Sequence, residues 1–311
     1  MKRYLSQCAI FLLVTLIAGV ASLSGRSAGT ATNDNAAAKT DGGNPQLLVS
    51  TQWLADHLSD PHLIVVYVGH MPEDYHAAHI PGSRFLAMDK IVDDRPPGTE
   101  LLPPEQLKKN LEDIGISDDS RVVYYAPDWD PMATRLFFTL DYIGHADHAA
   151  LLDGGMDRWL HEKRPTSTED PAITRGTLTI HLHPEIVEKM DAMKKLVTDD
   201  ISKSGVLIVD ARPMKRYRAG HLPGAVPMFW ETNLVSADDA VLKSPQELRQ
   251  MFAKAGYSNG EKVVSYCEVG YQASYTYFVA RYLGLNAAMY DGSYNEWSSA
   301  KQSVVRGDAA R

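Results

Sequence analysis

The residues best suited to chemistry lie in the stretch 263–284, VVSYCEVGYQASYTYFVARYLG. Val263–Tyr266 is a β-branched and aromatic run typical of a buried strand, and helix-like spacing of apolar residues begins at about Gln272. Cys267 is therefore predicted to lie in a tight turn between a strand and a helix N-terminus. Backbone N–H groups of residues 268–272 can point into such a turn and stabilise an anion. We expect this surrounding to lower the pKa of the thiol and make it a nucleophile.

The cysteine content supports a role for this thiol. The chain has only two cysteines, Cys8 and Cys267, and Cys8 lies in a segment that resembles an export signal. A mature exported protein with one cysteine cannot form an internal disulfide, and a lone thiol in an oxidising compartment is a liability unless it has a use. The alternative is an unreactive cysteine buried at a strand end, since unpaired cysteine is among the most buried residue types.

The first 21 residues are predicted to be a signal peptide. Lys2 and Arg3 give a basic start, and an apolar run over 8–20 precedes small residues that offer a cleavage site. Residues 22–45 are rich in Ala, Gly, Ser, Thr and Asn, so we expect a flexible tether there. The protein is thus expected to be exported, to the periplasm, without stable membrane insertion once the signal is cleaved. An uncleaved anchor is the alternative.

Length and composition indicate a globular protein and narrow the choice of partners. With 311 residues, 44% hydrophobic and 23% charged, the chain is long enough for two domains of ordinary size. A formal net charge of −8 argues against nucleic acid as a general partner. Any anion site must therefore be local, because the overall field repels anions.

Three segments occur twice, in the same order and at nearly constant spacing. They are HIPGSRF at 79–85 with HLPGAVP at 221–227, ATRLFFTLDYIG at 133–144 with ASYTYFVARYLG at 273–284, and DGGMDRW at 153–159 with DGSYNEW at 291–297. Such a repeat indicates two homologous domains. We predict a first domain over 46–163, a linker over 164–176 and a second domain over 177–305.

Each copy is predicted to alternate strands with helices. In the second copy we expect a helix over 187–196, a strand over 206–209, a helix opened by a capping box at 244–247 and a strand over 287–290. This alternation predicts an α/β fold in which each domain has a mostly parallel sheet with helices on both faces. Active sites on such sheets lie beyond the carboxyl ends of the strands, where Cys267 falls.

The ordered set of motifs resembles the tandem-domain rhodanese family of sulfurtransferases. The matching segments are STQWLADHL at 50–58, HIPGS and DARP…GHLPGA in the two halves, DGG or DGS before a tryptophan, and CEVGYQAS at 267–274. The resemblance covers nearly everything from Leu47 to Trp297. It implies two rhodanese-like domains and a cysteine persulfide that passes sulfur from a donor to a thiophilic acceptor, with no metal or organic cofactor.

The resemblance also implies roles for particular residues. Cys267 matches the family's catalytic cysteine. The loop that would cradle its persulfide consists of Glu268, Val269, Gly270, Tyr271 and Gln272. Asp210 and Arg212 match a pair that we expect to be a buried structural ion pair near the site. Arg216 matches a position of a donor-binding arginine, whose fork can hold a sulfonate or carboxylate, the alternative being an ordinary surface arginine. We expect His221 to be a turn and packing residue.

The two halves are not equivalent in chemistry. In the first half, Ala126 stands in place of the cysteine, and Val68 and His70 stand in place of Asp210 and Arg212. The first domain therefore cannot form a persulfide. Its expected role is structural, closing one side of the active-site cleft, as in the family, where usually only the C-terminal domain is active.

The loop after Cys267 bears on the choice of donor. In the family that the chain resembles, basic residues there suit thiosulfate and a small Gly-Ser-Gly-Val-Thr-like loop suits 3-mercaptopyruvate, whereas Glu268, Tyr271 and Gln272 match neither pattern. We expect thiosulfate as donor and cyanide or a thiol as acceptor, with 3-mercaptopyruvate and a protein acceptor as alternatives. A carboxylate beside the site would repel a dianion by an amount that depends on whether it faces the pocket.

Other protein classes share parts of this pattern. A cysteine phosphatase or arsenate reductase needs an arginine six residues after the cysteine, where this chain has Ala273. Two histidine pairs, His181 with His183 and His145 with His148, lack convincing partners for a metal site. The main alternative to an enzyme is a persulfide carrier or partner-binding module without turnover. Steady-state thiocyanate formation from thiosulfate and cyanide would separate the two.

Overall fold

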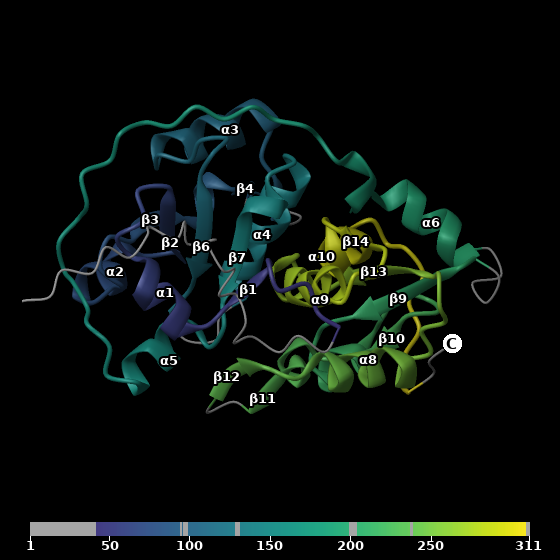
Figure 1. Cartoon of the computed structure of the whole chain (residues 1–311). Helices are drawn as coiled ribbons and strands as arrows, with labels where there is room; N and C mark the ends of the chain where they lie inside the picture. Colours follow the sequence, from purple (N-terminus) through teal and green to yellow (C-terminus); the bar gives the residue numbers. More distant parts are fainter. Residues whose placement is uncertain are drawn as a thin grey trace, which may run out of the picture. The chain divides into compact units, whose positions relative to one another are not determined.

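The computed structural model describes residues 42–93, 95, 99–127, 131–198, 204–236 and 239–308. All of them belong to one compact unit, 35–311, which holds two five-stranded sheets (Figure 1). The predicted signal peptide, Cys8 and nearly all of the predicted tether lie outside the described residues. Within the described ranges, no helix has both the length and the apolar character needed to cross a membrane.

The first sheet is parallel throughout, with the strand order β1-β7-β6-β2-β3. Its strands are β1 (Leu48–Val49), β2 (Leu63–Gly69), β3 (Arg84–Ala87), β6 (Arg121–Tyr125) and β7 (Ala149–Leu152). The helices of this half are α1 (Thr51–His57), α2 (Pro72–Ala77), α3 (Pro104–Asp113), α4 (Met132–Tyr142) and α5 (Gly155–His161). A separate antiparallel hairpin consists of β4 (Val92–Asp93) and β5 (Glu100–Leu101).

The second sheet repeats this plan in the order β10-β9-β13-β14-β8, again with parallel pairs only. Its strands are β8 (Val187–Glu188), β9 (Val206–Asp210), β10 (Val226–Pro227), β13 (Lys262–Tyr266) and β14 (Ala287–Tyr290). Its helices are α6 (Met190–Thr198), α7 (Met214–Ala219), α8 (Pro245–Lys254), α9 (Tyr271–Tyr282) and α10 (Ser293–Ser299). Its separate hairpin consists of β11 (Leu234–Ser236) and β12 (Asp239–Leu242).

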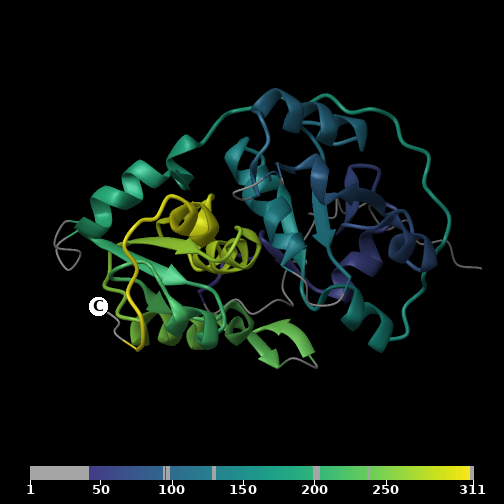
Figure 2. The same cartoon turned by 180° about the vertical axis from the view of Figure 1, so that it is seen from behind.

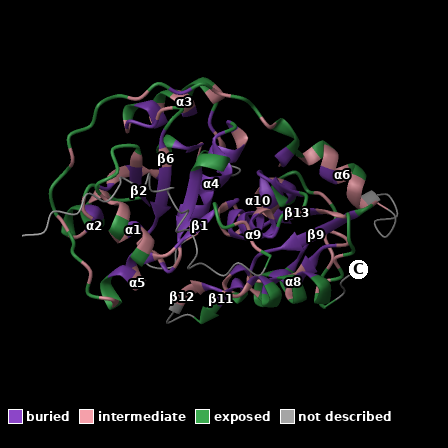
Figure 3. Ribbon diagram, in the orientation of Figure 1, coloured by how far each residue is buried: buried purple, intermediate pink, exposed green. Residues whose placement is uncertain are grey.

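Both faces of each sheet are buried under helices, as Figure 1 and the reverse view in Figure 2 show. Successive strand residues point to opposite faces. In β13, for example, Val263 joins one apolar core and Val264 joins another. The central strands are consequently buried along most of their length (Figure 3). The prediction of two α/β domains with mostly parallel sheets is confirmed.

The local predictions in the second half hold in most places and are wrong in one. The capping box that opens α8 is present, with the Ser244 side chain accepting the Glu247 N–H at 3.3 Å. The predicted helix over 187–196 is wrong at its start. Val187 and Glu188 form the edge strand β8, which pairs with β14, and α6 begins at Met190. The apolar spacing could not reveal a strand partner that lies far along the chain.

The segment between α5 and Pro184 contains no helix or strand and follows the surface of the first domain. Ser167 forms a backbone bridge with His79, and the Thr179 N–H donates to Asp118 Oδ1 at 2.6 Å. Residues 177–183, which we expected to open the second domain, are thus attached to the first. At the other end of the described chain, the Asn44 N–H donates to the Tyr282 carbonyl at 2.7 Å.

The two domains meet along α4 and α9. The Thr134 and Ser274 hydroxyls, near the starts of these helices, are 2.9 Å apart. Near their ends, Arg281 Nε donates to Asp141 Oδ2 at 2.9 Å. Because the first turns of the two helices contact each other and so do their last turns, the helices run in the same direction. Their N-termini therefore lie side by side.

Candidate active site

Cys267 follows the central strand β13 and precedes α9. Its side chain is buried, because β9 and β14 flank the strand and the first turn of α9 covers its end. The Gly270 N–H donates to Cys267 Sγ at 3.0 Å. Gly270 has φ +98°, a left-handed conformation that glycine adopts without the steric cost of a Cβ. The turn is thereby tight enough to aim backbone donors at the sulfur.

Burial raises the pKa of the Cys267 thiol in this structure. Four backbone N–H groups act in the opposite direction by favouring the thiolate, and they belong to Ala273, Val269, Gly270 and Gln272. The expectation of a net lowered pKa is therefore wrong, because the loss of solvation outweighs these donors. Ala273 was missing from the predicted loop, since the first turn of α9 continues the ring of donors beyond the loop itself.

Asp210 and Arg212 form a buried ion pair beside the cysteine loop. Arg212 Nη2 lies 2.7 Å from Asp210 Oδ2, and the Tyr266 hydroxyl donates to the same oxygen at 2.7 Å. The second arm of the guanidinium, Nη1, reaches Glu268 Oε2 at 3.1 Å. The Glu268 carboxylate is thus held by a cation that Asp210 also binds, so the three side chains together carry one net negative charge.

Arg216 occupies the outer side of the short helix α7 and is exposed. Its guanidinium makes no hydrogen bond or ion pair with any residue that the structure describes. His221, a few residues later, is fully buried, and its ring stacks on Tyr217 with a centroid distance of 3.7 Å. Its ring Nδ1 lies 2.9 Å from the Tyr217 carbonyl, which fits a packing role.

Ser293 supports the backbone of the cysteine itself and was not identified from the sequence. Its Oγ accepts the Cys267 N–H at 3.3 Å and donates to the Tyr290 carbonyl at 2.9 Å. Ser293 has φ +54°, and the equivalent residue of the first domain is Gly155 with φ +55°. A non-glycine residue in this region costs about 1–3 kcal/mol. The change from DGG to DGS between the repeats was the available signal.

The first domain contributes side chains to the cysteine loop. Arg135 of α4 and Asp291 are both fully buried, with Nη1 2.7 Å from Oδ1. The other oxygen of Asp291 accepts the Leu101 N–H at 2.8 Å. The Thr99 hydroxyl donates to the Val269 carbonyl, and the Thr99 carbonyl accepts Arg135 Nη2 at 2.8 Å. No local pattern marked Thr99 or Arg135 as part of the site, because Val269 and Asp291, which they bind there, lie in the other domain.

A matching attachment joins the hairpin of the second domain to the first domain. There the Leu242 N–H of β12 donates to Asp153 Oδ1 at 2.8 Å, as Leu101 of β5 does to Asp291. Each domain thus extends a hairpin to the DG motif of the other. In addition, His70 of the first domain contacts Tyr271 of the cysteine loop edge to face, with ring centroids 5.9 Å apart.

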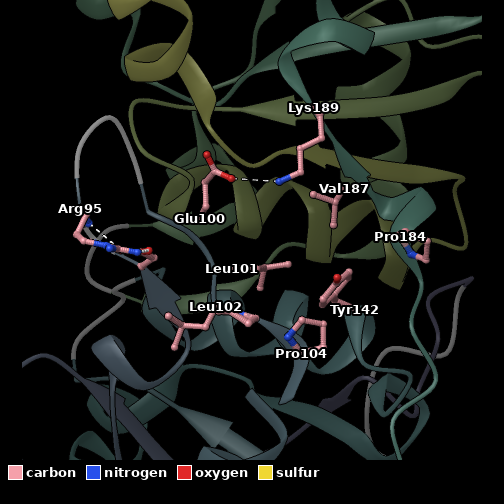
Figure 4. Close-up of a pocket in the computed structure, with 11 residues that line it drawn as sticks. Arg95, Glu100, Leu101, Leu102, Pro104, Tyr142, Pro184, Val187 and Lys189 are labelled. Atoms are coloured by element: carbon pink, nitrogen blue, oxygen red, sulfur yellow. Dashed lines mark hydrogen bonds and ion pairs between the residues drawn. The ribbon is translucent and has the colours of Figure 1, made fainter. Parts of the chain in front are cut away.

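A cavity of about 750 Å³ lies against the β4–β5 hairpin (Figure 4). Leu101, Leu102 and Pro104 line one side, and Lys189 on the opposite side pairs with Glu100 at 3.1 Å. Cys267 is not among the lining residues. Among the described residues, no group of three or more His, Cys, Asp or Glu side chains is arranged to hold a metal ion.

Comparison with known proteins gives matches over most of the chain. A model of the rhodanese-like domain matches residues 50–162 and again 193–300. The sulfur carrier protein TtuD of Thermus thermophilus is 30% identical over 276 residues, which covers 82% of this chain and 95% of that protein. A thiosulfate sulfurtransferase of Azotobacter vinelandii is 29% identical over 269 residues, covering 83% of this chain and 96% of that protein.

Solved structures with a similar fold include an anaerobic ergothioneine biosynthesis enzyme from Chlorobium limicola in complex with trimethyl histidine. It is 22% identical, with a TM-score of 0.75, and the match covers 85% of this chain and 71% of that one. The crystal structure of YnjE is 24% identical, with a TM-score of 0.75 and coverage of 86% and 70%. At such identities the likeness concerns the fold alone.

Proposed function

Because the chain belongs to the rhodanese-like family, with one domain of that family in each half, we propose that it is a sulfurtransferase that carries sulfur as a persulfide on Cys267. The observation that carries this proposal is the buried Sγ that accepts the Gly270 N–H within a ring of backbone donors. Such donors stabilise negative charge, which a thiolate carries on Sγ and a persulfide on its terminal sulfur. The names of the two relatives, a sulfur carrier and a thiosulfate sulfurtransferase, support it.

The reaction consists of two displacements at sulfur. The Cys267 thiolate attacks the outer sulfur of thiosulfate, so a new S–S bond forms while the donor's own S–S bond breaks and sulfite leaves with the electron pair. A nucleophile such as cyanide then attacks the terminal sulfur of Cys–S–S⁻. Thiocyanate forms, the persulfide bond breaks, and the Cys267 thiolate is regenerated. Splitting one transfer into two easier steps is the benefit of a covalent intermediate.

The choice of thiosulfate as the donor rests on the exposed cation of Arg216. The Glu268 carboxylate contacts Arg212, but Asp210 shares that guanidinium, so this cluster keeps one net negative charge that would repel a dianion. Arg216 is exposed and has no side-chain partner among the described residues, which leaves its fork available for the sulfonate end of a donor. The first domain contributes by closing over the loop through Thr99 and Arg135.

The decisive experiment is the intact mass of the purified protein after incubation with thiosulfate and, separately, with 3-mercaptopyruvate. A gain of one sulfur atom with thiosulfate, absent in Cys267→Ser, is the expected result. A gain with 3-mercaptopyruvate alone would reassign the donor. No gain with either would reject the proposal, provided that circular dichroism shows the protein to be folded.

A persulfide carrier is the second candidate, and the likeness to a protein named sulfur carrier favours it. The two candidates differ in turnover rather than in the first step. Steady-state thiocyanate formation from thiosulfate and cyanide is expected for an enzyme. A carrier would form the persulfide once and release sulfur only to a protein acceptor.

Export to the periplasm is part of the same proposal and rests on the basic and apolar composition of residues 1–21. Cell fractionation followed by N-terminal sequencing tests it. A mature chain that begins near Ser22 in the exported fraction is the expected result. A full-length chain confined to the cytoplasm would contradict it.

A further inference from the structure

We propose that Thr99 of the first domain is a positioning residue for the Cys267 thiolate, acting through the peptide bond between Val269 and Gly270. This inference rests on the proposed role of Cys267 as the reactive thiol. It assigns to the domain without a cysteine a specific part in the chemistry of the other domain. Thr99 itself does not touch the sulfur.

The geometry of a single peptide unit carries the inference. The Thr99 hydroxyl donates to the Val269 carbonyl, and the Gly270 N–H of the same peptide donates to Cys267 Sγ at 3.0 Å. A trans peptide is planar, with its C=O and N–H pointing in opposite directions. Holding the carbonyl therefore fixes the direction of the N–H. A donor on the carbonyl also polarises the amide and strengthens the bond that its N–H makes.

Thr99 is held firmly enough to act in this way. Its own carbonyl accepts Arg135 Nη2 at 2.8 Å, and two residues later the Leu101 N–H donates to Asp291 at 2.8 Å. Thr99 is 7% exposed, so water does not compete freely for its hydroxyl. A Cβ on Gly270 would lie 3.5 Å from Thr99 Oγ1, which shows how closely the two segments approach.

The first domain contains a counterpart of this site that lacks both the thiol and the hydroxyl. Ala126 there follows β6 as Cys267 follows β13. Ala240 precedes Leu242 by two residues, as Thr99 precedes Leu101, and it lines a cavity of about 30 Å³ together with Ala126. The half without the thiol thus also lacks the hydroxyl, although its hairpin attachment to Asp153 is retained. Attachment of the domains therefore does not require the hydroxyl.

The test is the pH dependence of alkylation of Cys267 by iodoacetamide, followed by mass spectrometry of the peptide that carries Cys267. Thr99→Val removes the hydroxyl at nearly constant shape. Its midpoint for thiolate formation should rise by about 0.5 pH unit, roughly a threefold loss of thiolate below the midpoint. Thr99→Ser keeps a hydroxyl and should retain the wild-type midpoint.

Thr51→Val is the matched control, because Thr51 is also buried in the first domain and donates its hydroxyl elsewhere, to Glu162 at 2.6 Å. Its midpoint should not move, even if its melting temperature falls. An unchanged midpoint in Thr99→Val would overturn the inference, as would equal shifts in Thr99→Val and Thr99→Ser. If Thr99→Val does not fold, Thr99→Ala takes its place with the same expectations.

Alkylation does not require sulfur transfer, so the two proposals can fail separately. Wild-type protein that gains no sulfur from either donor would reject the proposed function. The difference between Thr99→Val and Thr99→Ser in the alkylation profile would still decide the role of Thr99. Persulfide formation measured on the same variants should fall about threefold in Thr99→Val if both proposals hold.

Discussion

Arg135 and Asp291 lie in different domains and form an ion pair in which both side chains are fully buried. The same aspartate receives the Leu101 N–H, and the same arginine binds the Thr99 carbonyl. In a buried pair, the cost of desolvating the two charges offsets much of their Coulomb attraction. Loss of one partner, however, leaves an unpaired charge in the interior. The contact is therefore more important for holding the domains in register than as a net source of stability.

Replacing Arg135 with methionine should lower the free energy of unfolding by roughly 3–5 kcal/mol, because Asp291 is then left buried without its cation. Urea unfolding measures this change. Arg218→Met is the matched control, since Arg218 pairs with Asp308 on the exposed surface and its loss should change little. Equal effects of the two substitutions would contradict the buried character of the Arg135 pair.

Replacing Gly270 with alanine should impair both folding and persulfide formation. Gly270 has φ +98°, and an added Cβ would lie 3.0 Å from Arg135 Nη1 and 3.2 Å from the Asp291 carbonyl. Gly260 is a natural control, because it has φ +90° and no atom within 4 Å of an added Cβ. Gly260→Ala should cost only the backbone term of about 1–2 kcal/mol. Gly270→Ala should cost more in urea unfolding and also slow sulfur uptake, which Gly260→Ala should leave unchanged.

Reactivity of Cys267 should increase with pH beyond the ordinary thiol range. Burial raises the pKa of this thiol, so the thiolate fraction in the free protein continues to grow above about pH 8.5, where an unperturbed thiol is half ionised. The rate at which Cys267 is alkylated, measured over a pH series by mass spectrometry of its peptide, reports this thiolate fraction directly. A rate that already reaches its plateau at neutral pH would show the thiol to be ionised there and the prediction to be wrong.

The raised pKa of Cys267 also predicts that the stability of the protein depends on pH. Because the folded pKa is raised above the unfolded value, the protonated thiol contributes stability that is fully present below the unfolded pKa and is lost as pH rises through the folded pKa. The unfolding free energy of wild type relative to Cys267→Ser should therefore decline above about pH 8.5. Comparison with Cys267→Ser removes the contribution of the many buried tyrosines, which titrate in both proteins.

Replacing Arg216 with alanine tests its proposed contact with the donor. If the arginine contributes binding equally before and during reaction, KM for thiosulfate should rise several-fold while kcat stays near wild type. Lys215→Ala is the control, because it removes an equal charge from an adjacent exposed position of α7. A KM that is unchanged, or raised equally in both variants, would leave Arg216 as an ordinary surface residue.

The sequence predicted the parts of the fold that depend on local pattern and on the repeat. Strand β14 begins and ends where it was expected, at 287 and 290, and α9 begins at Tyr271, one residue before the expected start. The edge strand β8 was missed, because two residues are too short for a period and their partner is remote. Local spacing specifies a helix or a central strand, whereas an edge strand exists only through its neighbour.

The residues of the candidate site likewise divide into those near Cys267 in the sequence and those distant from it. Cys267 and its loop are contiguous, so their spacing was visible in the sequence. Thr99, Arg135 and Ser293 act across the fold, and no spacing rule joins them to the cysteine. The pKa of the thiol was mispredicted for a related reason. A helix N-terminus can be recognised in a sequence, but the depth at which the thiol is buried depends on how the strands and α9 pack around it.

The contact between α4 and α9 joins equivalent positions of the two repeats. Thr134 meets Ser274, and Asp141 meets Arg281, in each case a residue and its own counterpart. A surface that contacts its own copy in this manner is isologous, the form that a two-fold homodimer requires. At this contact the two halves of the single chain are thus related as the subunits of a two-fold homodimer are. The symmetry ends at the chemistry, since only the second half carries the thiol and the first half binds the loop that follows it through Thr99.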